Sequence, residues 1–184
     1  MSENPETTHI LGALECLLFM ADRPLTLAEL AELLDISTPA VRQLLEGLED
    51  RYLGLRIVEV AGGVELVTRP EFAEYVARLH RPPKFRLSPA SMETLAIVAY
   101  RQPVTRPEIE MLRGVNSDSV INTLLEHGLV EERGHKPVPG KPMLYGTTEK
   151  FLKLFGLAGL NALPDLATFV EQVVPTLEGF EEKA

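Results

Sequence analysis

The sequence has little of what secreted, membrane and metal-cluster proteins require. Its 184 residues contain a single cysteine, Cys16, so an internal disulfide and a thiolate metal cluster are both excluded. The longest apolar runs, such as Leu17–Ala21 and Leu95–Ala99, are far shorter than the ~20 residues that a membrane-spanning helix needs. The polar, acidic start at Met1–Thr8 does not resemble a secretory signal. We therefore expect a cytoplasmic protein.

Patterns typical of catalytic and metal sites are also missing. The histidines are spread along the chain without the close spacing of metal ligands on one helix, at His9, His80, His127 and His135. Neither a phosphate-binding glycine loop nor a nucleophile elbow occurs. Cys16 lies among the leucines of an apolar helical stripe, which predicts a buried, inert thiol. We expect no enzyme activity, no cofactor and no metal.

Positive charge is scarce and unevenly distributed. The formal net charge of −9 argues against a protein whose main task is to wrap nucleic acid. Residues 1–80 hold 6 basic and 14 acidic side chains, residues 81–156 hold 11 and 8, and residues 157–184 hold 1 and 5. This asymmetry predicts two units with different surroundings, followed by an acidic tail.

The chain repeats itself at an offset of 79 residues. Apolar and turn residues recur in phase, as in Pro24/Pro103, Thr26/Thr105, Leu30/Ile109, Leu45/Leu124 and Phe72/Phe151. Each copy has three helical stripes, then two strand-like runs, then a short amphipathic closing helix. We predict two tandem winged-helix domains, each a helix-turn-helix with a β-hairpin, in a mainly α fold with small β wings (α+β). Two unrelated helical domains that share a generic pattern are the alternative.

Proline and glycine residues suggest where the units begin and end. We expect a disordered N-terminus, a first winged-helix domain, a linker, a second winged-helix domain and an acidic tail, at residues 1–8, 9–80, 81–87, 88–156 and 157–184. The linker assignment rests on Pro82 and Pro83, because proline disfavours helix on its N-terminal side. We expect the tail to order only on a partner.

Neither helix-turn-helix is well suited to read DNA, which requires base-reading side chains together with basic groups for the phosphates. In the first copy Glu46 and Glu49 follow Arg42 and Gln43, and the stretch Ser117–His127 of the second copy has no lysine or arginine. Basic residues gather instead near the second wing, at Arg133, His135, Lys136 and Lys141. They could contact phosphates or an acidic partner, or be ordinary surface charge. A winged-helix DNA-binding transcription regulator therefore stays the alternative hypothesis.

One series of short motifs resembles a known family. It comprises Glu93–Tyr100, Gln102–Arg106, Arg113–Ser117, Leu124–Leu129, Pro139–Pro142, Leu144–Thr148 and Phe151–Leu152. This series is similar to that of the ScpB family, the segregation and condensation subunits of bacterial SMC–kleisin complexes, and the likeness covers roughly residues 9–166. Lys141 stands where the family usually has arginine, and His135 stands where arginine or lysine is common. Only a contact that needs a bidentate guanidinium is therefore in doubt.

The resemblance implies a non-catalytic adaptor that serves chromosome condensation and segregation at the nucleoid. It implies a homodimer that binds the kleisin ScpA, reaches the SMC ATPase through the kleisin and contacts DNA at most indirectly. We expect kleisin contacts in the second domain, at Tyr100, Arg113, Val115, Leu144 and Tyr145. We expect dimer contacts in the first domain, at Ile10, Leu11 and Leu18. Any of these residues could instead serve the fold alone.

Overall fold

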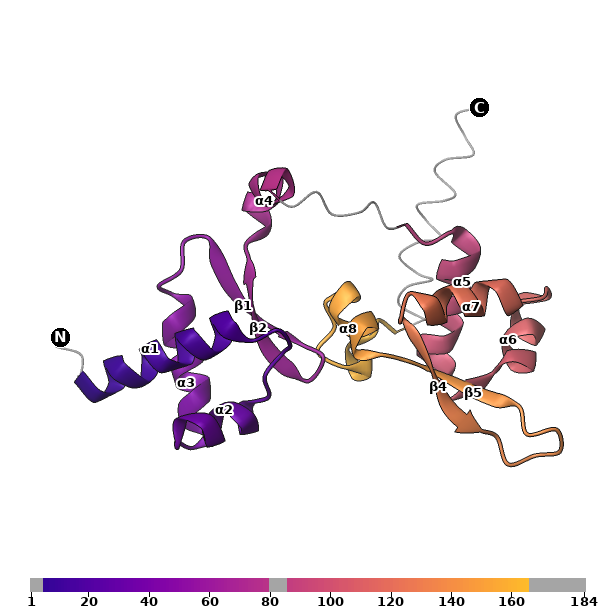
Figure 1. Cartoon of the computed structure of the whole chain (residues 1–184), viewed down its shortest axis with the longest axis horizontal. Coiled ribbons are helices and arrows are strands. Elements are labelled where there is room, and N and C mark those ends of the chain that lie inside the picture. Colours follow the sequence, from indigo (N-terminus) through magenta and orange to yellow (C-terminus); the bar gives the residue numbers. More distant parts are fainter. Residues whose placement is uncertain (1–4, 80–85, 166–184) are drawn as a thin grey trace.

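The computed structural model of the chain describes residues 5–79 and 86–165, which form two winged-helix domains in series (Figure 1). The elements of the first domain are α1 (Pro5–Met20), α2 (Leu27–Leu34), α3 (Thr38–Glu49), β1 (Leu55–Val60), β2 (Gly63–Thr68), the 3₁₀ turn η1 (Pro70–Phe72) and α4 (Ala73–Leu79). Strands β1 and β2 pair antiparallel as a hairpin, the first wing.

The second domain repeats this order with one additional strand. Its elements are α5 (Pro89–Arg101), β3 (Val104–Thr105), α6 (Arg106–Arg113), α7 (Asp118–Glu126), β4 (Val130–His135), β5 (Met143–Thr147), α8 (Glu149–Phe155) and the 3₁₀ turn η2 (Leu160–Ala162). Strand β5 lies between β3 and β4, and both pairings are antiparallel. The predicted fold class is therefore confirmed.

The repeat is visible in the start of the second helix of each domain. In α2 the Thr26 hydroxyl accepts the Glu29 amide at 3.1 Å, while the Glu29 carboxylate accepts the Thr26 amide at 2.7 Å. In α6 the Glu108 carboxylate accepts both the amide and the hydroxyl of Thr105, at 2.9 and 2.7 Å. The bonds are reciprocal at α2, and at both helices the glutamate accepts a threonine amide that has no partner inside the helix. The threonine–glutamate spacing in the sequence thus fixes where both helices begin.

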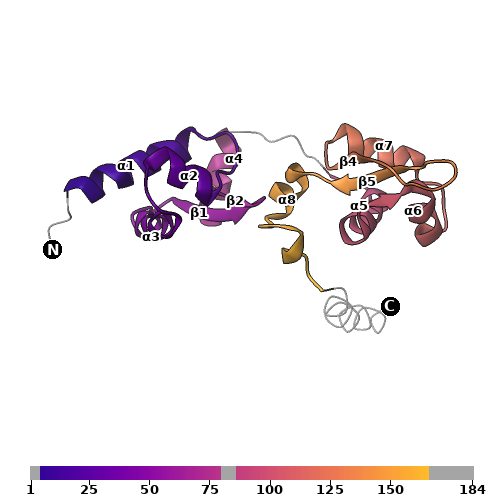
Figure 2. The same cartoon turned by 90° about the horizontal axis from the view of Figure 1, so that it is seen from below.

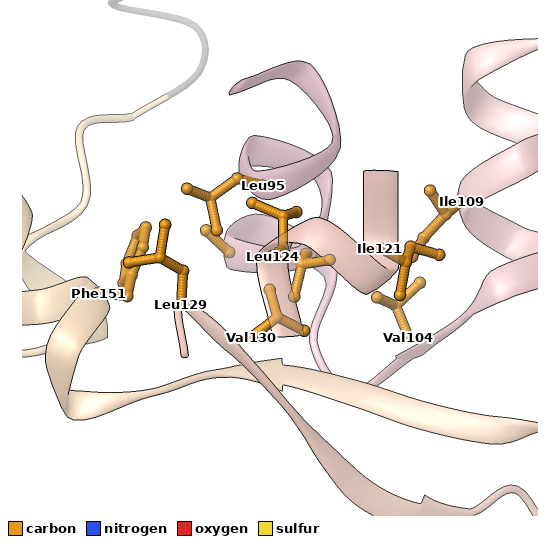
Figure 3. Close-up of a cluster of buried hydrophobic side chains, with 10 residues drawn as sticks. Leu95, Val104, Ile109, Ile121, Leu124, Leu129, Val130 and Phe151 are labelled. Atoms are coloured by element: carbon orange, nitrogen blue, oxygen red, sulfur yellow. The ribbon is translucent and has the colours of Figure 1, made fainter. Parts of the chain in front are cut away.

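Each domain has its own hydrophobic core. The first contains Leu11, Leu14 and Leu18 of α1 together with Leu30, Val41, Leu45, Leu48 and Val64. Figure 3 shows the second, in which Leu95, Val104, Ile109, Ile121, Leu124, Leu129, Val130 and Phe151 converge from α5, β3, α6, α7, β4 and α8. The helical spacing of i, i+3 and i+4 along α1 and α7 places these side chains on one face of each helix.

The closing helices of the two domains differ, although the sequence predicts them as equivalents. Phe151 of α8 is 3% exposed inside the second core, whereas its repeat partner Phe72 is 40% exposed. Helix α4 contains no buried residue, and Tyr75 and Leu79 face solvent. In Figure 1, α4 projects away from the rest of the first domain. The helix exists as expected, but its apolar side chains do not join the core.

The tip of the first wing contacts the second domain. The amides of Ala61 and Gly62 donate to the carbonyls of Leu157 and Ala158 at 2.9 and 2.7 Å. Both views place α8 beside this hairpin (Figure 1; Figure 2). The Lys153 ammonium of α8 also lies 2.9 Å from the Glu65 carboxylate of β2. The two domains are therefore joined by main-chain bonds in addition to the connecting chain.

Three local expectations from the sequence differ from the structure. Helix α1 begins at Pro5, inside the stretch expected to be disordered. Residues 157–165 pack on the second domain, where Leu157 and Leu163 contact its core, although we expected the tail to order only on a partner. Cys16 is exposed, so the prediction of a buried thiol is wrong. The reason is that Cys16 lies between the core positions Leu14 and Leu18 and points off their face. Linker residues 81–85 lie outside the described residues.

Candidate interaction surfaces

The described residues offer neither a metal centre nor a membrane segment. Within residues 5–79 and 86–165, no group of three or more His, Cys, Asp or Glu side chains is placed to hold a metal ion. Among the same residues no helix is both long enough and apolar enough to cross a membrane.

The third helix of each domain presents a nearly neutral or acidic face. On α3 the Arg42 guanidinium lies 3.5 Å from the Glu59 carboxylate of the first wing, with Glu46 exposed one turn further on. On α7 Asp118 forms an ion pair with Arg106 at the start of α6. Phosphates would meet carboxylates on both helices, which is unfavourable for DNA reading.

Two basic residues of the second wing, Arg133 and Lys136, are engaged by their own domain. The Lys136 ammonium lies 2.6 Å from Glu108, and Arg133 lies 2.8 Å from Glu131 while donating to the Thr147 carbonyl at 2.9 Å. The hydrogen bond from Lys136 and those from Thr105 lower the pKa of Glu108 from 4.5 to about 2. These bonds bind the β4–β5 hairpin to the start of α6.

Tyr100, expected to contact a kleisin, is bonded to the segment that follows α8. Its hydroxyl donates to the Pro164 carbonyl at 2.7 Å. The ring lines an apolar groove between α5 and α8 together with Ala96, Phe155 and Leu163. The structure therefore places Tyr100 at the edge of a hydrophobic surface that the C-terminal segment already enters.

Arg113 and Val115 lie at the end of α6 but differ in exposure. The Arg113 side chain is 6% exposed and donates to Glu93 at 3.0 Å and to Ser117 at 2.9 Å. Arg113 thus supports the turn with a buried guanidinium, while its partner Glu93 is 54% exposed. Val115 is 55% exposed, and Met111 and Leu112 beside it are also exposed. Sequence reasoning missed Met111 and Leu112, two exposed apolar side chains in the last turn of α6 shortly before Val115.

Leu144 and Tyr145 lie on β5, the middle strand of the sheet. Leu144 pairs with Thr105 and Tyr145 with Val104. Both side chains are partly buried, and Tyr145 packs against the second core. The five expected kleisin residues are therefore divided among the α5 groove, the α6 turn and the sheet, and Val115 has the most exposed apolar side chain among them.

The expected dimer residues occupy both core and surface. Leu11 and Leu18 are buried in the first core. Ile10 is half-buried and lines a groove of about 590 Å³ between α1 and α3, together with Ile36 and Leu44. Apolar side chains that the sequence argument did not select are far more exposed, namely Phe19, Met20, Tyr75 and Leu79.

Together, the duplicated domains, the nearly neutral or acidic helix-turn-helix faces and the exposed apolar surfaces define a tandem winged-helix protein suited to protein contacts. The family model of the segregation and condensation complex subunit ScpB matches residues 12–166. The chain belongs to this family. It is thus a non-catalytic subunit of the bacterial SMC segregation and condensation complex, as the resemblance implied, and the family implies association with the chromosome.

The chain is similar to several named proteins of this family. The chain is 51% identical over 163 residues to segregation and condensation protein B of Desulforamulus reducens, covering 86% of this chain and 90% of that protein. It is similar to the crystal structure of ScpB from Mycobacterium tuberculosis, with 37% identity, 85% and 99% coverage and a TM-score of 0.39. A crystal structure of a dimer of the ScpB N-terminal domain complexed with ScpA peptide is 30% identical, with 39% and 95% coverage and a TM-score of 0.37.

Proposed function

We propose that this chain is a dimeric adaptor that binds the kleisin ScpA and reaches the SMC ATPase through it, in the cytoplasm at the nucleoid. The observation that carries the proposal is the pair of exposed apolar surfaces, one on each domain, in a chain of the ScpB family. ScpA is the partner to test because an ScpA peptide accompanies a dimer of the ScpB N-terminal domain in a solved complex, which supports the partner and not the choice of the second domain.

The kleisin surface is proposed to lie in the second domain, around Val115. Met111 and Leu112 extend its apolar area, and Arg113 holds the turn below it through Glu93 and Ser117. Tyr100, Leu144 and Tyr145 complete the proposed set. An amphipathic kleisin helix could lay its apolar face on such a surface, since helix-in-groove binding needs a few apolar anchors at helical spacing.

Calorimetry with the central ScpA segment of the same organism tests this surface. We expect Val115→Asp to weaken binding at least roughly ten-fold, because a buried charge at an interface centre costs more than ~1.4 kcal/mol. The matched control is Val138→Asp at the second wing tip, since Val138 is a comparably exposed valine at 41%. Equal affinities of the two variants would remove Val115 from the interface.

The dimer surface is proposed to lie in the first domain. Helix α4 has an exposed apolar face, whereas its repeat counterpart α8 buries Phe151 in a core. A second copy is the occupant that would supply α4 with the missing cover. Ile10 would contribute through the α1–α3 groove, and the core residues Leu11 and Leu18 would act by positioning α1.

Sedimentation equilibrium tests the dimer surface. Leu79 is 78% exposed on α4, and we expect Leu79→Glu to shift the protein from dimer to monomer. Leu53→Glu is the control, because Leu53 is 91% exposed in the loop before β1. A Leu79→Glu variant that dimerises like the control would place the dimer contact elsewhere.

A further inference from the structure

The first wing ends in a turn whose two amides have no acceptor inside their own hairpin. Ala61 and Gly62 connect the paired ends of β1 and β2, and both have positive φ angles, of 50° and 78°. This is the geometry of a type I′ turn, in which the amides of the two central residues do not join the strand pairing. Here they donate to carbonyls of the second domain, those of Leu157 and Ala158.

The segment that accepts these bonds is fixed to the second domain. Gly156 ends α8 in a left-handed conformation with φ of 64°, and the Leu157 amide donates to the Leu152 carbonyl at 2.9 Å. The Leu157 side chain packs against the second core. Its amide and side chain thus serve its own domain, while its carbonyl and that of Ala158 accept from the first wing. The second domain itself therefore positions this pair of acceptors.

One ion pair lies beside these main-chain bonds. The Lys153 ammonium of α8 lies 2.9 Å from the Glu65 carboxylate of β2, and the two side chains are 35% and 23% exposed. A cleft of about 750 Å³ is lined by residues 22–24 of the first domain and by Glu149 and Leu154 of α8 (Figure 2). The domains thus meet through polar bonds beside an open cleft. Relative motion is expected of domains whose contact is small and polar.

We propose that the tip of the first wing and the carbonyls of Leu157 and Ala158 form a reversible latch between the domains. Closed, the latch holds the two domains in one arrangement; open, it lets them reorient independently. Water can replace each main-chain bond when the domains separate, so these bonds set the geometry of the closed state more than its population. The Glu65–Lys153 pair shifts the balance toward the closed state, because it forms only when the wing lies against α8.

Amide hydrogen exchange and residual dipolar couplings, measured by NMR on the full chain, test the latch. In the unmodified protein we expect the Ala61 and Gly62 amides to exchange about ten-fold or more slowly than free amides, and the couplings of both domains to fit one common orientation. Glu65→Lys sets two ammonium groups against each other. It should speed exchange of both amides about three- to ten-fold and give each domain its own orientation. The charge swap Glu65→Lys/Lys153→Glu should restore both readouts.

Two controls separate opening of the latch from unfolding. The Leu157 amide, bonded within its own domain, should stay protected in every variant. Glu32→Lys makes the same change of charge at an exposed site on α2 and should leave both readouts unchanged.

Three results would overturn the proposal. The first is fast exchange of the Ala61 and Gly62 amides in the unmodified protein. The second is a Glu65→Lys variant that keeps their protection or keeps one common orientation, because another contact would then hold the domains. The third is a charge swap that fails to restore what Glu65→Lys removes, because the effect would then not act through Lys153. None of these readouts requires ScpA.

Discussion

The Lys136 ammonium lies 2.6 Å from the Glu108 carboxylate, which also caps α6 through Thr105. One carboxylate thus ties the second wing to the helix-turn-helix. The pKa of Glu108 is lowered from 4.5 to about 2, so its ionised form stabilises the fold. That contribution is fully present above pH 4.5 and disappears as the pH falls toward 2, because the unfolded chain then binds a proton more readily.

We therefore expect Glu108→Gln to lower the free energy of unfolding of the second domain at pH 7 by about 1 kcal/mol, a cap-sized effect limited by solvent exposure. The difference from the unmodified protein should shrink through pH 4 and vanish near pH 2. Urea denaturation at several pH values measures it. Glu131→Gln, which removes only a surface partner of Arg133, is the control, and a pH-independent difference would contradict the assignment.

Arg113 is expected to stabilise the second domain. Its side chain is 6% exposed and bonded to Glu93 and Ser117. We expect Arg113→Ala to lower the free energy of unfolding by about 2 kcal/mol, since it leaves polar partners without their donor. Thermal denaturation measures the loss. If Arg113→Ala abolished ScpA binding without affecting stability, Arg113 would contact the partner directly.

Gly63 is required by the close approach of the first wing to the strand-like residue Leu25. A Cβ at position 63 would lie 2.8 Å from the Leu25 carbonyl group. The main chain cannot easily move away, because the amides of Leu25 and Val64 each donate to the carbonyl of the other. We expect Gly63→Ala to lower the free energy of unfolding of the first domain by about 1–3 kcal/mol. Gly47→Ala in α3 is the control, because a Cβ there meets no atom within 4 Å. The control should be neutral or slightly stabilising. Equal stabilities of the two variants would show that the hairpin adjusts.

The alternative of a DNA-binding regulator makes an opposite prediction. Arg133 and Lys136 are engaged by carboxylates, and α7 has no basic residue. We expect no saturable binding of a fluorescent duplex at physiological salt up to ~10 µM, the range in which non-specific binders associate. Fluorescence anisotropy measures this. Micromolar affinity with a steep salt dependence, lost in Lys141→Glu, would favour the alternative.

The parts of the fold that rest on local chemistry could be predicted from the sequence. The Thr26/Glu29 and Thr105/Glu108 pairs locate α2 and α6, because a capping box acts over three residues. Whether each closing helix packs into its core could not be predicted, because Phe72 and Phe151 have the same local pattern and differ only in tertiary packing. Periodicity also failed for Cys16, which has apolar neighbours in sequence but lies off their face.

The surfaces were harder to predict than the elements. Val115 is exposed as a contact residue must be, but Arg113 beside it faces inward, and sequence alone cannot separate the two. The contact of Ala61 and Gly62 with Leu157 and Ala158 uses main-chain groups, which every residue has, so no side-chain pattern signals it.

The central claim, a dimeric adaptor that binds a kleisin, is tested most directly by light scattering coupled to size exclusion. The chain is run alone and mixed with the central ScpA segment of the same organism. The account predicts a dimer alone and a stable, heavier complex in the mixture, whose mass gives the stoichiometry. A monomer whose elution and mass do not change when the ScpA segment is added would contradict this account.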